Sequence, residues 1–105
     1  MAGSLVLIQE TTVSSATASV TLTGIDSTFD VYTVYFSNVE CTTDNEEFFF
    51  RVTTGGTPDS DSQYDYAMKE LKSYGDFSDS GSTNGTQQYI TYLGTPTQEQ
   101  ANGIL

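Results

Sequence analysis

The sequence predicts an all-β protein, and three observations support that prediction. Residues that suit a pleated, half-buried surface are frequent, including seven tyrosines and six phenylalanines among 105 residues. Several short segments alternate apolar and polar side chains at the two-residue period of a strand. Glycine and other turn-forming residues separate these segments. About six short strands in a chain of this size predict a single antiparallel β-sandwich domain over residues 1–105.

The clearest strand pattern spans residues 18–38. Ala18, Val20 and Leu22 alternate with hydroxylated residues, and a turn at residues 24–28 follows. Residues 29–38 then place apolar groups on both faces, which is typical of a strand covered on both sides. We therefore expect residues 29–36 to form the central core strand.

Three further segments show a strand pattern: residues 4–11, 48–54 and 87–93. Polar or turn-forming stretches are expected to connect the strands: residues 12–17, 39–47, 55–59, 75–85 and 94–102. The composition of residues 75–85 predicts an exposed and mobile loop. Residues 103–105 look like the beginning of one more strand, which suggests either that C-terminal strands are lacking or that a neighbouring chain completes the sandwich.

Residues 63–74 fit two kinds of element. Tyr64, Ala67, Met68 and Leu71 have the spacing of a short amphipathic helix. Tyr64, Tyr66 and Met68 also fit the period of a strand, and a strand is preferred because the neighbouring segments are strand-like. Among sandwiches, a jelly-roll connection is preferred, although the spacing fits another Greek key equally well.

The charge of the chain excludes several classes of partner. Fourteen acidic residues against three basic ones give a formal net charge of −11. Such a chain has too few cations to neutralise the phosphates of a nucleic acid, and an anionic membrane surface would repel it. Its apolar runs are also too short for insertion into a membrane. The acidity is typical of a well-solvated surface, with calcium or a basic partner as the alternative interpretation.

Little in the sequence points to catalysis or to a cofactor. The chain contains no histidine, and Cys41 has no basic neighbour in sequence to lower its pKa. Carboxylates are so numerous that no pair stands out as an acid and a base. We therefore expect neither an enzyme nor a cofactor. A surface calcium site is the remaining alternative, and its candidate ligands are Asp59, Asp61 and Asp65 in one loop and Asp76, Asp79 and Asn84 in a later one. The first loop lacks the glycine and the closing glutamate of an EF-hand.

Tyrosine is the residue type best suited to a binding surface in this chain. The candidates are Tyr64, Tyr66, Tyr89 and Tyr92. Their rings could stack on sugars or anchor a protein partner. The alternative is that these amphipathic side chains fill the rim of a small core.

Two segments carry a resemblance to a known group of proteins. They are SLVLIQETTVSSATASVTLTGIDSTFDVYTVYFSNV (residues 4–39) and QYDYAMKELKS (residues 63–73), and TGIDSTFDVYTVYFSN is the clearest element. In these segments the chain resembles virion structural proteins and tail-fibre domains of marine tailed phages. The resemblance implies a β-sandwich, assembly into a virion, and a homo-oligomer, most often a trimer. Its motifs are structural, so it implies no catalytic residue.

The sequence thus leads to two hypotheses of different classes. The first is a non-enzymatic bacteriophage structural protein, in a tail fibre or appendage or decorating the capsid, that is assembled in the host cytoplasm and acts through contacts with its own copies and other virion proteins. The second is a module that recognises host-surface glycans through the tyrosines. A small acidic glycosidase is a third hypothesis, and it would require paired carboxylates in a cleft.

Overall fold

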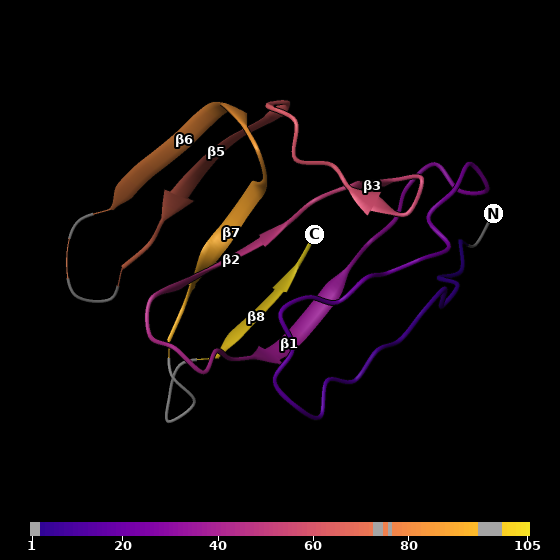
Figure 1. The fold of residues 1–105 in the computed structure, drawn as a ribbon, viewed down its shortest axis with the longest axis horizontal. Helices are drawn as coiled ribbons and strands as arrows, with labels where there is room; N and C mark the ends of the chain where they lie inside the picture. The colour runs from indigo at the N-terminus through magenta and orange to yellow at the C-terminus, as the bar shows by residue number, and fades with distance from the viewer. Residues whose placement is uncertain (1–2, 73–74, 76, 95–99) are drawn as a thin grey trace.

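The computed structural model describes residues 3–72, 75, 77–94 and 100–105, and in these ranges the chain is all-β (Figure 1). Its strands form four antiparallel pairs: β1 (Tyr35–Val39) with β8 (Ala101–Ile104), β2 (Glu46–Phe50) with β7 (Gln88–Leu93), β3 (Thr53–Thr54) with β4 (Thr57–Pro58), and β5 (Tyr64–Glu70) with β6 (Ser78–Gly85). The predicted all-β, antiparallel class is confirmed.

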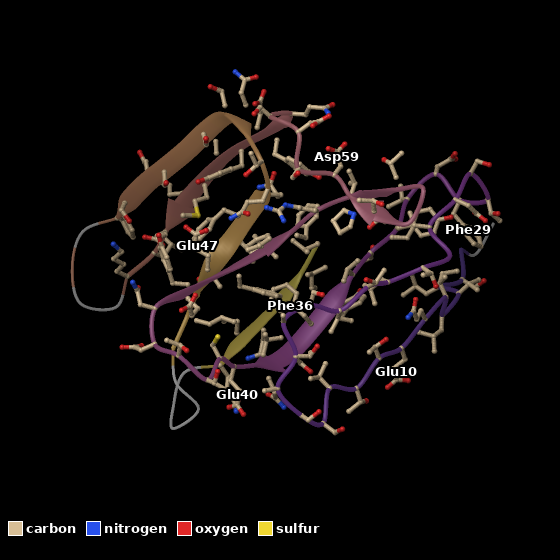
Figure 2. All side chains as sticks on the ribbon, viewed as in Figure 1. Glu10, Phe29, Phe36, Glu40, Glu47 and Asp59 are labelled. Atoms are coloured by element: carbon tan, nitrogen blue, oxygen red, sulfur yellow. The ribbon has the colours of Figure 1, made fainter. Side chains whose placement is uncertain are left out.

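The β2–β7 pair lies between two other pairs and contacts each through an aromatic side chain. Phe48 of β2 packs edge-on against Phe36 of β1, with ring centroids 5.2 Å apart. Tyr89 of β7 contacts Tyr66 of β5, with centroids 5.9 Å apart. Figure 2 shows Phe36 near the middle of the molecule. Aromatic contacts therefore connect the strand pairs on both sides of β2–β7.

Two of the pairs contain a bulge with an asparagine in the left-handed region. Asn38, at φ 52°, donates its backbone N–H to Oδ1 of Asn102 across the pair, over 2.9 Å. Asn84, at φ 56°, donates its N–H to Oδ1 of Asp65 over 2.7 Å. Asparagine tolerates this conformation better than most residues. In both bulges a side chain on the opposite strand thus binds a backbone donor that the interrupted ladder leaves free.

The N-terminal third of the chain differs most from prediction. Residues 3–34 contain no strand, so the strands predicted at residues 4–11 and 18–23 are wrong, and of the strand predicted at residues 29–38 only residues 35–38 form one. The predicted central strand is also wrong, because β1 begins only at Tyr35 and Phe29 is exposed. The sequence pattern describes side chains that suit a strand, whereas a strand also needs a partner edge for its backbone groups. Val34 exchanges two backbone hydrogen bonds with Leu105, but the described part of the chain provides no such edge for residues 3–33.

The remaining predictions have mixed outcomes. The preference for a strand over a helix is confirmed by β5, and the strand at residues 87–93 by β7. The predicted strand at 48–54 is divided, since β2 ends at Phe50. The loop predicted at 75–85 is wrong where β6 forms, because pairing with β5 outweighs the weak strand propensity of its small polar residues. The predictions for residues 73–74, 76 and 95–99 lie outside the described residues.

Candidate functional site

Three of the four candidate tyrosines lie together on one face of β7 and β5. In the β2–β7 ladder Phe48 pairs with Thr91 and Phe49 with Tyr89, so Ile90 is an extra residue. This bulge brings Tyr89 and Tyr92 to the same face although they are three residues apart, and their centroids are 5.3 Å apart. Tyr66 contacts Tyr89 from β5. We call Tyr66, Tyr89 and Tyr92 the tyrosine row.

Exposure differs along the tyrosine row. Tyr92 is 52% exposed, whereas Tyr66 and Tyr89 are half-buried. Tyr64, the fourth candidate, has a different role in the structure. Its hydroxyl accepts a hydrogen bond from the backbone N–H of Val52 (3.0 Å) and donates one to the carbonyl of Asp59 (2.9 Å). Tyr64 therefore ties β5 to the chain around the β3–β4 hairpin.

A chain of polar contacts borders the tyrosine row. Arg51 donates from Nη2 to Oε1 of Gln87, and Gln87 donates from Nε2 to Oε2 of Glu47, each over 2.9 Å. Glu47 is the cross-strand partner of Tyr92. We call Arg51, Gln87 and Glu47 the polar relay. Sequence reasoning did not select these residues, although the two-residue spacing of Glu47, Phe49 and Arg51 already puts them on one face.

Arg51 makes two further contacts that fix its position. Its Nε donates to the carbonyl of Thr86 over 2.9 Å, and its guanidinium carbon lies 5.0 Å from the centroid of the Phe49 ring. The guanidinium thus combines a cation–π contact with hydrogen bonds to two successive residues of the turn that leads into β7. It holds the polar relay in place at one end.

The Tyr89 hydroxyl is buried and has no hydrogen-bond partner. Burial, with smaller contributions from Tyr92 and Glu70, raises the pKa of Tyr89 to about 12. Glu70 has the opposite shift: a hydrogen bond from Ser78 (2.6 Å), followed by one from Lys72, lowers the pKa of its carboxyl group. The Tyr89 hydroxyl therefore stays protonated at neutral pH, whereas the Glu70 carboxyl group stays ionised.

Tyr89 is expected to ionise late in an alkaline titration. Because its pKa in the folded state exceeds the ordinary value of about 10, the folded state holds this proton more tightly than the unfolded state does. The stability contributed by Tyr89 is therefore present below pH of about 10 and is lost as the pH rises towards about 12. Ultraviolet titration of the native protein and of Tyr89→Phe measures this, and the variant should lack the latest tyrosine transition. An unchanged titration curve would contradict the assignment.

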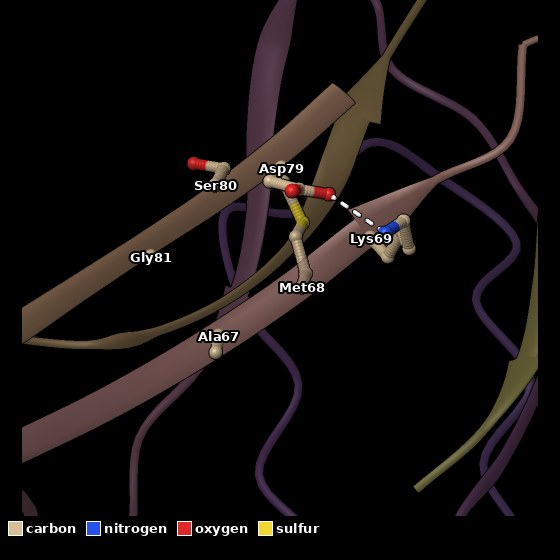
Figure 3. A pocket seen from close by; sticks show the side chains of 6 residues that line it. All are labelled: Ala67, Met68, Lys69, Asp79, Ser80 and Gly81. Carbon is tan, nitrogen blue, oxygen red and sulfur yellow. Dashed lines mark ion pairs between the residues drawn. The ribbon is translucent and has the colours of Figure 1, made fainter. Parts of the chain in front are cut away.

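Two depressions lie elsewhere on the surface. One runs along the β5–β6 pair, where Lys69 and Asp79 form an exposed ion pair of 3.4 Å (Figure 3). The other lies between β7 and β8; Tyr92 of the tyrosine row lines it, together with Phe36, Ile90, Leu93, Ala101 and Asn102 among others. Both are open to solvent, and neither includes Tyr66 or Tyr89.

The acidic residues proposed for calcium have separate roles in the structure. Asp59 accepts the backbone N–H of Asp61, Asp65 accepts that of Asn84, and Asp79 pairs with Lys69. Asp76 lies outside the described residues. Within the described ranges, no three acidic or cysteine side chains gather as they would around a metal ion. These ranges also contain no helix that is long and apolar enough to cross a membrane.

Comparison with known proteins identifies no relative. No family model matches the chain, and neither a curated protein nor a solved structure is detectably similar to it. The arrangement of side chains is therefore the basis for assigning chemistry. The tyrosine row and polar relay supply aromatic faces, a carboxylate and an amide, which are groups suited to binding.

Proposed function

We propose that this chain is a non-enzymatic structural protein of a bacteriophage virion, which acts by packing against copies of itself and against other virion proteins. The observation that carries the proposal is the large surface that the single chain exposes. Its accessible surface is 8619 Å², whereas a folded monomer of 11.4 kDa exposes roughly 5,800 Å². The excess of about 2,800 Å² is of the size that obligate assemblies bury.

The nature of the exposed surface supports the same proposal. Leu93, at 7% exposed, is the one apolar side chain that is buried among the described residues. Large apolar side chains are exposed along the chain, including Leu5, Leu7, Val31, Tyr35, Leu71 and Ile104. The Cα radius of gyration, 15.6 Å, also exceeds the value of about 13 Å expected for a compact domain of this length. Exposed apolar surface of this extent favours burial against another chain.

The order of strand pairing supports a sandwich with jelly-roll-like connections. The pairs β1–β8 and β2–β7 are nested around the β3–β4 and β5–β6 hairpins (Figure 1). Nested antiparallel pairing is how a long folded hairpin builds a jelly roll. In this proposal the pairs join into two packed sheets when further chains cover their open edges.

The phage assignment rests on the sequence resemblance, which covers essentially the whole chain and is carried mainly by residues 4–39 and 63–73. It places the protein in a tail fibre or other appendage, or on the capsid as a decoration protein, and a trimer is the preferred oligomer. The virion is then its location, after assembly in the host cytoplasm.

The oligomeric state tests this proposal directly. Size-exclusion chromatography with light scattering, under reducing conditions that prevent crosslinking through Cys41, should give a mass several times 11.4 kDa. A folded, stable monomer at high protein concentration would contradict the proposal. Antibody labelling of intact phage particles then tests whether the protein belongs to the virion.

Recognition of host-surface glycans is the second candidate function, and the exposed ring of Tyr92 favours it. A sugar ring could stack on Tyr92, with the neighbouring carboxylate of Glu47 accepting its hydroxyls. A glycan array with the native protein and Tyr92→Ala separates the two functions. Loss of array signal in the variant supports glycan recognition. If the native oligomer binds no glycan on the array, glycan recognition is contradicted and only the structural function remains.

A further inference from the structure

The N-terminal segment, defined as residues 3–25, is not paired with any strand among the described residues. Within the described residues, no backbone–backbone hydrogen bond involves this segment. Its side chains nevertheless have the alternation of a strand, with Leu5 and Leu7 among the most exposed apolar residues of the protein. A segment that is chemically suited to a sheet but lacks a sheet edge is available to another chain.

Side-chain contacts hold the two halves of this segment beside each other. Oε1 of Gln9 accepts the backbone N–H of Thr23 over 2.6 Å and the hydroxyl of Thr23 over 3.2 Å. Ile8 also lies against Gly24, where an added Cβ would come within 2.8 Å of Ile8 Cγ2. The two strand-like stretches are therefore already aligned, and ordering them on a partner costs less entropy than ordering a free chain.

The N-terminal segment carries little charge that would repel another copy. Glu10 is its one charged residue, whereas all other acidic residues and the three cations lie from Asp26 onward. Two copies with a net charge of −11 repel each other in general. Contact through this almost uncharged segment adds little to that repulsion.

A receiving surface lies on the β1–β8 pair. Tyr35 and Ile104 are directly paired across the two strands and are 67% and 64% exposed. The opposite face of the same pair carries Phe36 and Gly103, which pack towards β2. In the described residues β1 pairs with β8 alone, so its other edge is open. The pair thus offers an uncovered apolar face beside an unpaired strand edge.

We propose that the N-terminal segment of one copy pairs as a β-strand with the open edge of β1 in a second copy and covers the Tyr35–Ile104 face there. This inference rests on the proposed function, because it requires self-association. It specifies which part of each copy makes the contact. The excess surface of about 2,800 Å² per chain is enough for each copy both to donate its segment and to receive one.

The test compares Leu7→Ser with Leu71→Ser in the full chain under reducing conditions. Both leucines are 78% exposed in the single chain, but Leu71 lies outside the proposed contact. Sedimentation equilibrium should give a dissociation constant at least tenfold higher for Leu7→Ser and for Ile104→Ser than for the native chain, and Leu71→Ser should match the native chain. Equal effects of Leu7→Ser and Leu71→Ser, or no effect of Ile104→Ser, would overturn the inference.

Hydrogen exchange supplies a second readout that side-chain packing alone would not change. Amides of residues 5–8 and 19–22 should exchange rapidly at low protein concentration and slowly at high concentration, because strand pairing between copies protects them. Fast exchange in a protein shown to be oligomeric would overturn this inference while leaving the proposed function intact. A native chain that remains monomeric would overturn both.

Discussion

Replacing Phe36 with alanine is expected to lower the free energy of unfolding by about 2–3 kcal/mol, the largest effect of any single truncation that we predict. Phe36 is the side chain through which β1–β8 contacts β2–β7. Its ring packs against Phe48 and lies directly over Gly103. The estimate lies below the range of about 3–5 kcal/mol for a buried phenylalanine because Phe36 is half-buried. Urea denaturation followed by circular dichroism measures the change.

Gly103 provides the matched partner for this experiment. A Cβ at position 103 would collide with the Phe36 ring, coming within 2.9 Å of Cε1 and 3.1 Å of Cε2. Gly103→Ala should therefore destabilise the native protein but should cost much less in the Phe36→Ala background, where the ring is absent. Phe77→Ala, at an exposed site, should stay within about 0.5 kcal/mol of the native value. Additive effects of the Phe36 and Gly103 substitutions would contradict the packing described here.

Arg51→Ala is expected to cost about 2 kcal/mol of stability, because it removes hydrogen bonds from a charged donor together with the cation–π contact. Gln87 would lose its donor, and the carbonyl of Thr86 would lose a partner. The polar relay would then no longer be anchored at that end. Thermal unfolding in parallel with the native protein gives the difference.

Two controls separate the geometry of Arg51 from its charge. Lys69→Ala removes the same formal charge from an exposed ion pair with Asp79 and should change stability by less than about 0.5 kcal/mol. Arg51→Lys keeps the charge but lacks the planar fork that reaches Thr86 and Gln87 together, so it should recover only part of the loss. Full recovery by lysine would show that charge alone matters at this position.

The sequence was a good guide where the chain contains both partners of a strand pair. Alternation in residues 64–70 and 88–93 predicted β5 and β7, and both strands have a partner within the chain. It failed for β6, whose serines and glycines have low strand propensity and follow β5 through pairing alone. For residues 4–23 the sequence predicted strands that do not form. Their side chains suit a strand, but the described part of the chain offers their backbone no strand edge to pair with.

The sequence predicted which residue type forms the candidate site but not which of those residues lie together. Tyrosines were recognised as binding candidates, but their grouping depends on the Ile90 bulge, which brings Tyr92 to the face of Tyr89. A regular strand would have placed those two rings on opposite faces. The bulge arises from the pairing of β7 with β2, and no local pattern in the sequence indicates it.

The scarcity of buried apolar side chains has a calorimetric consequence. The heat-capacity change of unfolding grows with the apolar area that unfolding exposes. Because Leu93, at 7% exposed, is the one buried apolar side chain of the described residues, folding of the isolated chain removes little apolar area from water. Most of the heat-capacity change would therefore accompany assembly. Folding and association would merge into one transition, whose midpoint temperature rises with protein concentration.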